Sequence, residues 1–259
     1  MTEPRFEIDG DVALVTGGSS GIGEAIAERF AAAGVDVVVC SREQDHVDPV
    51  AESIEETTAS EALAVECDVT DRDAVEAMID ATVAEFGGLD VLVNNAGGSF
   101  VANFEDVSPN GWRTIVDVNL TGAYHFTQAG AGALKDGGGS VVNLSSVAGR
   151  EGAPTMTPYA AAKAGVEALT RSLAQEWAPA GVRVNAVAPG FVATPGVARQ
   201  LGIDPGAIDR EVVDRRIATS EEIAAIAHFL ASRGASFVTG ETLTARGAPE
   251  PISFPEGQS

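Results

Sequence analysis

Positive charge is scarce in this sequence. Lys135 and Lys163 are its only lysines, and 16 basic residues stand against 38 acidic ones, which gives a formal net charge of −22. A field of this sign repels nucleic acids and anionic membranes, so we expect neither as a partner. An acidic chain with almost no lysine is similar to proteins adapted to high intracellular salt, and an ordinary acidic protein from a GC-rich genome is the alternative.

Residues that form crosslinks or bind metals are also few. Cys40 and Cys67 are the only cysteines, each at the end of an apolar run, and His46, His125 and His228 are scattered without ligand spacing. We therefore expect two unpaired structural thiols and no metal site.

Long apolar segments are missing as well. No apolar run approaches the roughly 18 residues of a membrane span, and residues 1–10 lack the basic and apolar regions of a signal peptide. We expect a soluble, cytoplasmic protein. With 259 residues, 45% of them hydrophobic, and no linker or internal repeat, the sequence predicts a single domain over residues 1–259.

Short apolar runs alternate with helical patterns along the chain. Strands so uniformly apolar are buried on both faces, and helical crossovers between them imply parallel order. The expected strands lie at 12–16, 37–40, 63–67, 91–94, 141–144, 182–187 and 242–244, and the expected helices at 22–33, near 50, 74–86, 109–134, around 159 and 221–231. This pattern predicts an α/β fold, a doubly wound Rossmann-type domain with about seven parallel strands flanked by helices.

A glycine-rich turn follows the first expected strand and opens directly into a helix. Gly17 permits a tight turn, Gly21 lets a pyrophosphate approach the backbone, and Gly23 lets helix and strand pack closely. The helix N-terminus then faces the anion. The turn predicts dinucleotide binding.

Tyr159 and Lys163 stand four residues apart on an expected helix, with three alanines between them. Positions i and i+4 share a helix face, so an ammonium would lie beside a phenol. A nearby cation favours the phenolate and would lower the pKa of Tyr159 toward the range useful for proton transfer. By itself the pair also fits a surface lysine on an amphipathic helix.

Several motifs in order resemble the short-chain dehydrogenase/reductase family over residues 12–240. The turn has the spacing T-G-x-x-x-G-x-G, Ser146 lies thirteen residues before Tyr159, and Asn119 sits in a V-D-V-N-L segment. The resemblance implies that Tyr159 is the general acid or base and that Ser146 hydrogen-bonds the substrate oxygen. Lys163 would contact the nicotinamide ribose, and the backbone of Asn119 would hold a water. Ser145 is the competing serine, although it would point to the other side of an extended segment.

The resemblance also implies a cofactor site. In it, Asp68 and Val69 would hold the adenine ring. The whole expected set is Gly17, Ser19, Ser20, Gly21, Ile22, Gly23, Ser41, Arg42, Asp68, Val69, Asn95, Ala96, Gly97, Tyr159, Lys163, Pro189, Gly190, Val192 and Thr194.

The end of the second expected strand bears on the choice of cofactor. NAD enzymes place an acid there to bind both ribose hydroxyls, whereas this chain has Ser41 followed by Arg42. A small hydroxyl and a guanidinium suit a 2′-phosphate, so NADP(H) is favoured over NAD(H). Arg42 could instead stack on the adenine or face solvent, which would leave NAD usable.

The substrate is less well defined. Residues 191–216 should form a lid that turn residues divide into short pieces. Little of this segment is strongly apolar, which argues against a large sterol. The expected reaction is hydride transfer between nicotinamide and a carbonyl or secondary alcohol, with a 3-oxoacyl thioester as one candidate. Alternatives within the family are a sugar or polyol dehydrogenase and an enoyl-thioester reductase, and a non-catalytic dinucleotide sensor is an alternative of another class.

The C-terminal region departs from the family pattern. Where many relatives carry an Asp-Gly-Gly turn that helps to build a tetramer, this chain has Ala245-Arg246-Gly247 and a polar tail over about 246–259. Relatives pair through long helices, here 109–134 and 157–178. The resemblance therefore implies a homodimer or homotetramer.

Overall fold

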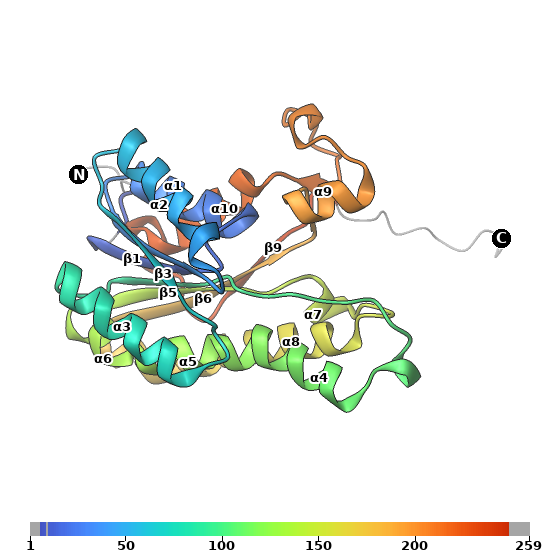
Figure 1. Cartoon of the computed structure of the whole chain (residues 1–259), viewed down its shortest axis with the longest axis horizontal. Coiled ribbons are helices and arrows are strands. Elements are labelled where there is room, and N and C mark those ends of the chain that lie inside the picture. The colour runs from blue at the N-terminus through green and yellow to red at the C-terminus, as the bar shows by residue number, and fades with distance from the viewer. Residues whose placement is uncertain (1–5, 9, 249–259) are drawn as a thin grey trace, which may run out of the picture.

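The computed structural model describes residues 6–8 and 10–248 (Figure 1). Its main sheet has seven parallel strands in the order β3-β2-β1-β4-β5-β6-β9. These strands are β1 (Val12–Thr16), β2 (Asp36–Ser41), β3 (Ala62–Glu66), β4 (Val91–Asn94), β5 (Gly139–Leu144), β6 (Val182–Pro189) and β9 (Thr242–Ala245). The strand order reverses between β1 and β4, which is the switch point where such sheets bind ligands. The predicted doubly wound parallel sheet is confirmed.

Helices cover both faces of the sheet. Figure 1 shows α1, α2 and α10 on one face and α3, α4, α5, α6 and α8 on the other. The helices are α1 (Gly21–Ala31), α2 (Gln44–Thr57), α3 (Arg72–Phe86), α4 (Pro109–Val116), α5 (Gly122–Ala129), α6 (Ala131–Asp136), α7 (Ala148–Glu151), α8 (Thr157–Trp177), α9 (Pro195–Leu201) and α10 (Ser220–Ala231).

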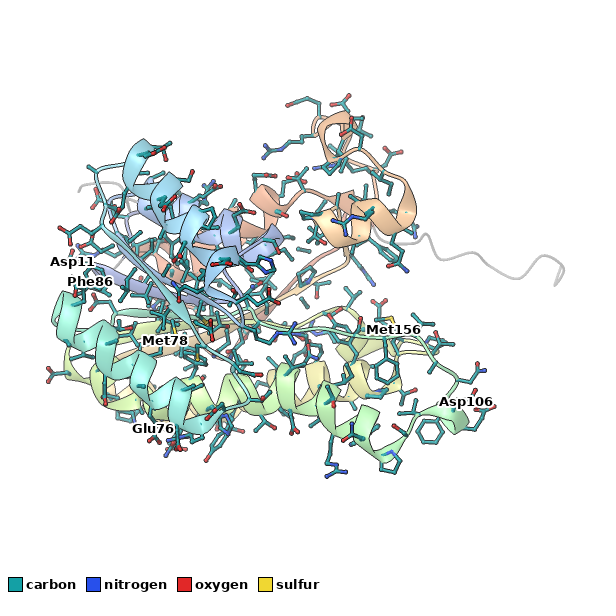
Figure 2. All side chains as sticks on the ribbon, in the orientation of Figure 1. Asp11, Glu76, Met78, Phe86, Asp106 and Met156 are labelled. Carbon is teal, nitrogen blue, oxygen red and sulfur yellow. The ribbon has the colours of Figure 1, made fainter. Side chains whose placement is uncertain are left out.

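The core lies on both sides of the sheet, as the side chains in Figure 2 illustrate. Along β2, Val37 and Val39 pack into one apolar cluster, whereas Val38 and Cys40 pack into the other. All four are fully buried. This alternation explains why the strand has no polar face and why its apolar run is continuous.

One expected helix is divided. Residues 109–134 form α4, a π-helical turn over Asp117–Thr121, α5 and the start of α6. Asn119 explains the turn, because its Nδ2 donates to the carbonyl oxygen of Ile115 at 2.9 Å. In a regular α-helix that oxygen would accept from the Asn119 backbone N–H. The backbone hydrogen bonds therefore shift locally to the wider spacing of a π-helix.

Residues 191–216, the segment expected to form a lid, follow the C-terminal end of β6. This segment contains β7 (Phe191–Val192) and α9, and β7 pairs in parallel with β8 (Ile217–Ala218) outside the main sheet. Of the expected polar tail, residues 249–259 lie outside the described part of the chain.

Two further features bear on function. Cys40 and Cys67 are free, buried thiols. Among residues 6–8 and 10–248, no helix combines the length and apolar character needed to cross a membrane, and no cluster of three metal-ligating side chains occurs there.

Candidate active site

The glycine-rich turn joins β1 to the N-terminus of α1. Gly17 and Gly21 adopt φ values of 64° and 63°, a region that favours glycine. A Cβ on Gly23 would lie 2.2 Å from the Gly17 carbonyl oxygen, so only glycine allows helix and turn to pack this closely. Ser20 precedes α1 without making a side-chain cap, which leaves the first backbone N–H groups of the helix available to an anion.

The turn is held from the end of β4. Asn95 Nδ2 donates to the carbonyl oxygens of Thr16 at 2.9 Å and Gly17 at 3.0 Å. In return, Thr16 Oγ1 accepts from the backbone N–H groups of Asn95 and Ala96, each at 3.0 Å. These bonds fix the two strand ends at the switch point, so the turn has a defined shape.

A cavity of about 660 Å³ opens beside this turn and contains the expected adenosine residues. Asp68 Oδ1 accepts from the N–H and hydroxyl of Thr70, which fixes the carboxylate. Ser41 Oγ donates to the Glu43 carbonyl oxygen at 2.7 Å. The exposed guanidinium of Arg42 makes no hydrogen bond or ion pair with the described residues, so it is free to meet a ligand.

A second cavity of about 750 Å³ adjoins the first and contains the expected catalytic residues. Ile22, Asn95, Gly97 and Thr194 line both cavities. Of the expected cofactor and catalytic residues, all except Gly23 line one cavity or the other. Gly23 packs helix against turn instead, in line with the role expected of it.

Lys163 lies at the floor of the second cavity and is 4% exposed. Its ammonium donates to the carbonyl oxygen of Leu144 at 2.7 Å and lies 5.6 Å from the centre of the Tyr159 ring. Burial lowers the pKa of Lys163 to about 8, because desolvation disfavours the charged form. The lysine can therefore gain or lose a proton near neutral pH.

The pKa of Tyr159 differs from the expectation. Burial raises it, and a hydrogen bond with the Ser146 hydroxyl opposes this rise. Burial outweighs the expected lowering by Lys163, whose ammonium donates to the Leu144 carbonyl oxygen and lies 5.6 Å from the centre of the Tyr159 ring. Helical spacing placed the two side chains correctly but could not give the balance between burial and charge.

The two adjacent serines face different partners. Ser146 Oγ accepts from the Ala148 N–H at 3.2 Å, and its hydroxyl is the group that opposes the rise in the pKa of Tyr159. Ser145 is buried, and its hydroxyl lies 3.2 Å from both the Lys163 carbonyl oxygen and Glu167 Oε1. The geometry therefore supports Ser146 over Ser145 as the serine that meets a ligand beside Tyr159.

Asn119 closes the inner wall of the cavity. Its Nδ2 donates to the Gly98 carbonyl oxygen at 2.7 Å. A Cβ on Gly97 would lie 2.6 Å from Asn119 Oδ1 and 3.4 Å from Lys163 Nζ. Glycine is required at 97 for this approach, so the segment after β4 can pass close to the lysine.

Comparison with known proteins identifies this arrangement. Residues 17–247 match a family model described as Enoyl-(Acyl carrier protein) reductase. A cis-4-hydroxycyclohexanecarboxylate dehydrogenase from Sinomonas cyclohexanicum is 42% identical, with 91% of this chain and 95% of that protein covered. A peroxisomal 2,4-dienoyl-CoA reductase from Danio rerio is 36% identical over 91% of this chain and 80% of its own length. A solved structure of a 7α-hydroxysteroid dehydrogenase complexed with NADH and 7-oxo glycochenodeoxycholic acid superposes with a TM-score of 0.84 at 32% identity, covering 93% of this chain and 95% of that one.

The chain belongs to the short-chain dehydrogenase/reductase family. It is an oxidoreductase that acts on alcohol or carbonyl groups with a nicotinamide dinucleotide. The turn fits that cofactor, since a side chain on Gly23 would collide with the turn and the α1 N–H groups remain available to a pyrophosphate.

Some residues that line the cavities of this oxidoreductase were not predicted. His46 lies beside Arg42 in the first cavity, with its Nδ1 3.5 Å from a Glu43 carboxylate oxygen. Met156 and Gln200 line the second cavity. His46 and Gln200 lie on α2 and α9, and Met156 immediately precedes α8, so their positions depend on how these helices pack beside the sheet; no motif spacing in the sequence marks them.

Proposed function

We propose that this enzyme transfers hydride between NADP(H) and a carbonyl or secondary alcohol, with Tyr159 as the general acid in reduction and the general base in oxidation. The observation that carries the proposal is the meeting of Ser146, Tyr159 and Lys163 in one cavity that shares its wall with the glycine-rich turn. When bound, the nicotinamide ring supplies or accepts the hydride.

The protein's residues handle the oxygen and its proton. In reduction, Tyr159 delivers its phenolic proton to the substrate oxygen while Ser146 donates a hydrogen bond that stabilises developing negative charge. Lys163, with a pKa of about 8, can return a proton toward Tyr159 after each turnover. Asn119, held beside the lysine, is positioned for the water contact that the family resemblance implies.

Two residues of the first cavity, Ser41 and Arg42, favour NADP(H) over NAD(H). Ser41 and Arg42 line the position at the end of β2 where an NAD-specific enzyme places an acid. The guanidinium of Arg42 makes no bond to the described residues and can grip a phosphate through several donors.

Two substrate classes compete. The 3-oxoacyl thioesters are the first candidate, because a complete serine, tyrosine and lysine set serves proton transfer to oxygen. The second is a neutral alicyclic ketone or alcohol. It is favoured by the wall of the second cavity, where Met156, Phe191 and Val197 contribute apolar surface and Lys163 is the only cation among the described lining residues. A thioester would have to leave its phosphates outside that cavity.

An activity panel tests the proposal and separates the candidates. In molar potassium chloride, the protein is assayed for oxidation of NADPH and of NADH with acetoacetyl-CoA, crotonyl-CoA, cyclohexanone and a ketose. We expect turnover of the first or third compound, faster with NADPH. Tyr159→Phe should lower kcat by roughly a hundredfold or more, since general acid–base catalysis contributes 10²–10⁴. Unchanged activity in this variant would refute the mechanism.

We also propose a cytoplasmic homo-oligomer, assembled through the long helices α4, α5 and α8. Trp112 on α4 and Tyr124 on α5 are large side chains that are 37% and 48% exposed, which suits a contact between copies. Sedimentation in molar potassium chloride tests this, and a monomer at micromolar concentration contradicts it.

A further inference from the structure

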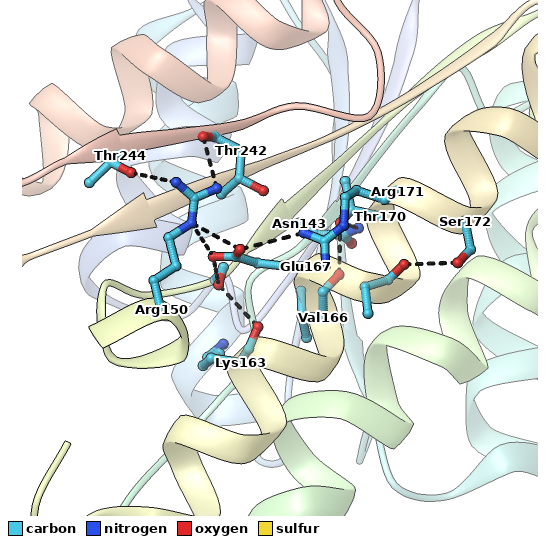
Figure 3. A network of polar contacts seen from close by, with 12 residues as sticks. Asn143, Arg150, Lys163, Val166, Glu167, Thr170, Arg171, Ser172, Thr242 and Thr244 are labelled. Atoms are coloured by element: carbon cyan, nitrogen blue, oxygen red, sulfur yellow. Dashed lines mark hydrogen bonds and ion pairs between the residues drawn. The ribbon is translucent and has the colours of Figure 1, made fainter. Parts of the chain in front are cut away.

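Glu167 is a buried carboxylate on α8, one helical turn beyond Lys163, and it does not line either of the two cavities. Its side chain is 7% exposed. Figure 3 shows it at the centre of a polar network that joins α8 to α7 and β9. A buried carboxylate needs specific partners, so the identity of these partners indicates what it does.

The strongest partner is Arg150 on α7. Its Nε lies 3.0 Å from Oε1 and 2.9 Å from Oε2 of Glu167. The other end of the guanidinium donates to Thr244 Oγ1 at 3.0 Å and to the Thr242 carbonyl oxygen at 3.3 Å on β9 (Figure 3). Arg150 therefore ties the short helix after β5 to both α8 and the last strand.

The second partner is Ser145. Its hydroxyl lies 3.2 Å from Glu167 Oε1 and at the same distance from the Lys163 carbonyl oxygen. A hydroxyl has one proton to donate, and the charged acceptor forms the stronger bond. Ser145 is thus anchored to the helix that carries Tyr159 and Lys163.

Both anchors flank Ser146. Ser145 precedes it and Arg150 follows it by four residues, so a single carboxylate holds the chain on both sides of this serine. The Ser146 hydroxyl is the group that lowers the pKa of Tyr159 against the effect of burial. Anything that lets the segment between β5 and α7 shift would weaken that hydrogen bond.

We propose that Glu167 is a positioning residue that, by anchoring Ser145 and Arg150, holds Ser146 in place beside Tyr159 in the second cavity. This inference rests on the function proposed for Ser146 and Tyr159. Glu167 acts through Ser145 and Arg150 and touches no reacting group.

The chain allows a direct measurement because it has only two tyrosines. In a Tyr124→Phe background, Tyr159 is the sole phenol, and ultraviolet difference spectra at the long-wavelength tyrosinate band report its ionisation alone. Tyr124 lies on α5, is 48% exposed and lines neither cavity, and phenylalanine keeps the ring that the proposed contact between copies would use, so this background should keep parental activity.

Glu167→Ala in that background should raise the pH of half-ionisation of Tyr159 by roughly 0.5 to 1 unit, the size expected when one hydrogen bond to the phenolate weakens. Glu167→Gln, which keeps one acceptor oxygen for Ser145 and Arg150, should give a smaller shift. The matched control is Arg171→Ala, which removes a cation 3.7 Å from the same carboxylate without touching the segment around Ser146 and should give no shift.

A purely structural role would lower stability and leave the titration unchanged. Equal titration curves for the parent, Glu167→Ala and Arg171→Ala would overturn the inference. If Glu167→Ala does not fold, the Tyr159 titration curves of Glu167→Gln and Arg150→Lys are compared with that of the parent instead. The inference is overturned if neither variant shifts the curve.

Turnover separates this inference from the proposed function. In oxidation of cyclohexanol or 3-hydroxybutyryl-CoA with NADP⁺, the rise of kcat with pH should move upward in Glu167→Ala by the same shift, while the KM for NADP⁺ stays unchanged. Loss of turnover in Tyr159→Phe together with an unshifted profile in Glu167→Ala contradicts the positioning role alone. Full activity in Tyr159→Phe contradicts the proposed function itself.

Discussion

The two halves of the site are built in different ways. In the catalytic half, Lys163 and Asn119 are 4% and 2% exposed, and each is hydrogen-bonded to backbone carbonyls. In the adenosine half, the guanidinium of Arg42 is exposed and bonded to no described residue, and the hydroxyl of Ser41 bonds only the backbone of Glu43. The catalytic groups are therefore placed before a ligand arrives, whereas the Arg42 guanidinium and the Ser41 hydroxyl are left to acquire partners from the ligand.

This difference predicts which property each substitution changes. Changes in the catalytic half should alter rate, pH dependence and stability, because they disturb groups already fixed in the protein. Changes in the adenosine half should alter affinity and cofactor preference and leave stability untouched.

The sharpest contrast lies between the neighbouring serines. Ser146→Ala removes the donor to the substrate oxygen and should lower kcat by about a hundredfold, the lower range for loss of one such donor. Ser145→Ala disturbs only the anchor to Glu167 and should cost much less. Steady-state kinetics with the best ketone of the panel measures both, and an equal or larger loss in Ser145→Ala would reverse the assignment.

Lys163 links the catalytic half to stability. Its pKa falls from 10.5 to about 8 on burial. When Lys163 is protonated in both the folded and the unfolded state, this shift corresponds to a destabilisation of the folded state by roughly 3 kcal/mol. Between these two values the unfolded chain binds more protons than the folded one, so stability rises with pH through that window. Below a pH of about 8 the full destabilisation by the buried Lys163 ammonium is present.

Lys163→Met should therefore be inactive and yet more stable at pH 7, by roughly 2 kcal/mol after about 1 kcal/mol is lost with the hydrogen bond to Leu144. The gain should shrink as the pH approaches 10. Urea unfolding of both proteins at several pH values measures it. A variant less stable than its parent by the same amount at every pH would show that desolvation of Lys163 carries no penalty.

The sequence predicted the parts of this site that depend on local spacing. The turn from Gly17 to Gly23, and the helical pair Tyr159 and Lys163, follow from spacing that a helix or tight turn converts directly into position. The parallel sheet follows from the short apolar runs that helices separate.

What the sequence did not predict depends on contacts between distant segments. Glu167 is four residues from Lys163, but its role depends on Arg150, which reaches it from across the segment after β5. The rise in the pKa of Tyr159 depends on its burial in the folded chain, which helical spacing does not reveal. The π-helical turn depends on one side-chain bond from Asn119, which helical periodicity does not reveal.

The smallest expected effects lie in the adenosine half. Ser41→Asp combined with Arg42→Ala places an acid near the ribose and removes the cation, so a 2′-phosphate would lose a charge-assisted hydrogen bond and meet repulsion. The ratio of kcat/KM for NADPH to that for NADH should fall by roughly 10- to 100-fold, the range that one or two such interactions allow. Stability in urea should not change.

The matched control is Arg72→Ala, which removes a partly exposed guanidinium. Among the described residues its only partner is Glu76 on the same helix, and Arg72 lines neither cavity. Arg72→Ala should leave the ratio of kcat/KM for NADPH to that for NADH unchanged.

Salt gives a second test of Arg42. Because Arg42 is exposed, salt should screen its attraction for the phosphate, so the preference of the parent for NADPH should weaken between low and molar potassium chloride. A preference that survives both the double substitution and molar salt would mean that recognition of the phosphate lies elsewhere in the first cavity, where His46 is the remaining basic side chain of its described lining.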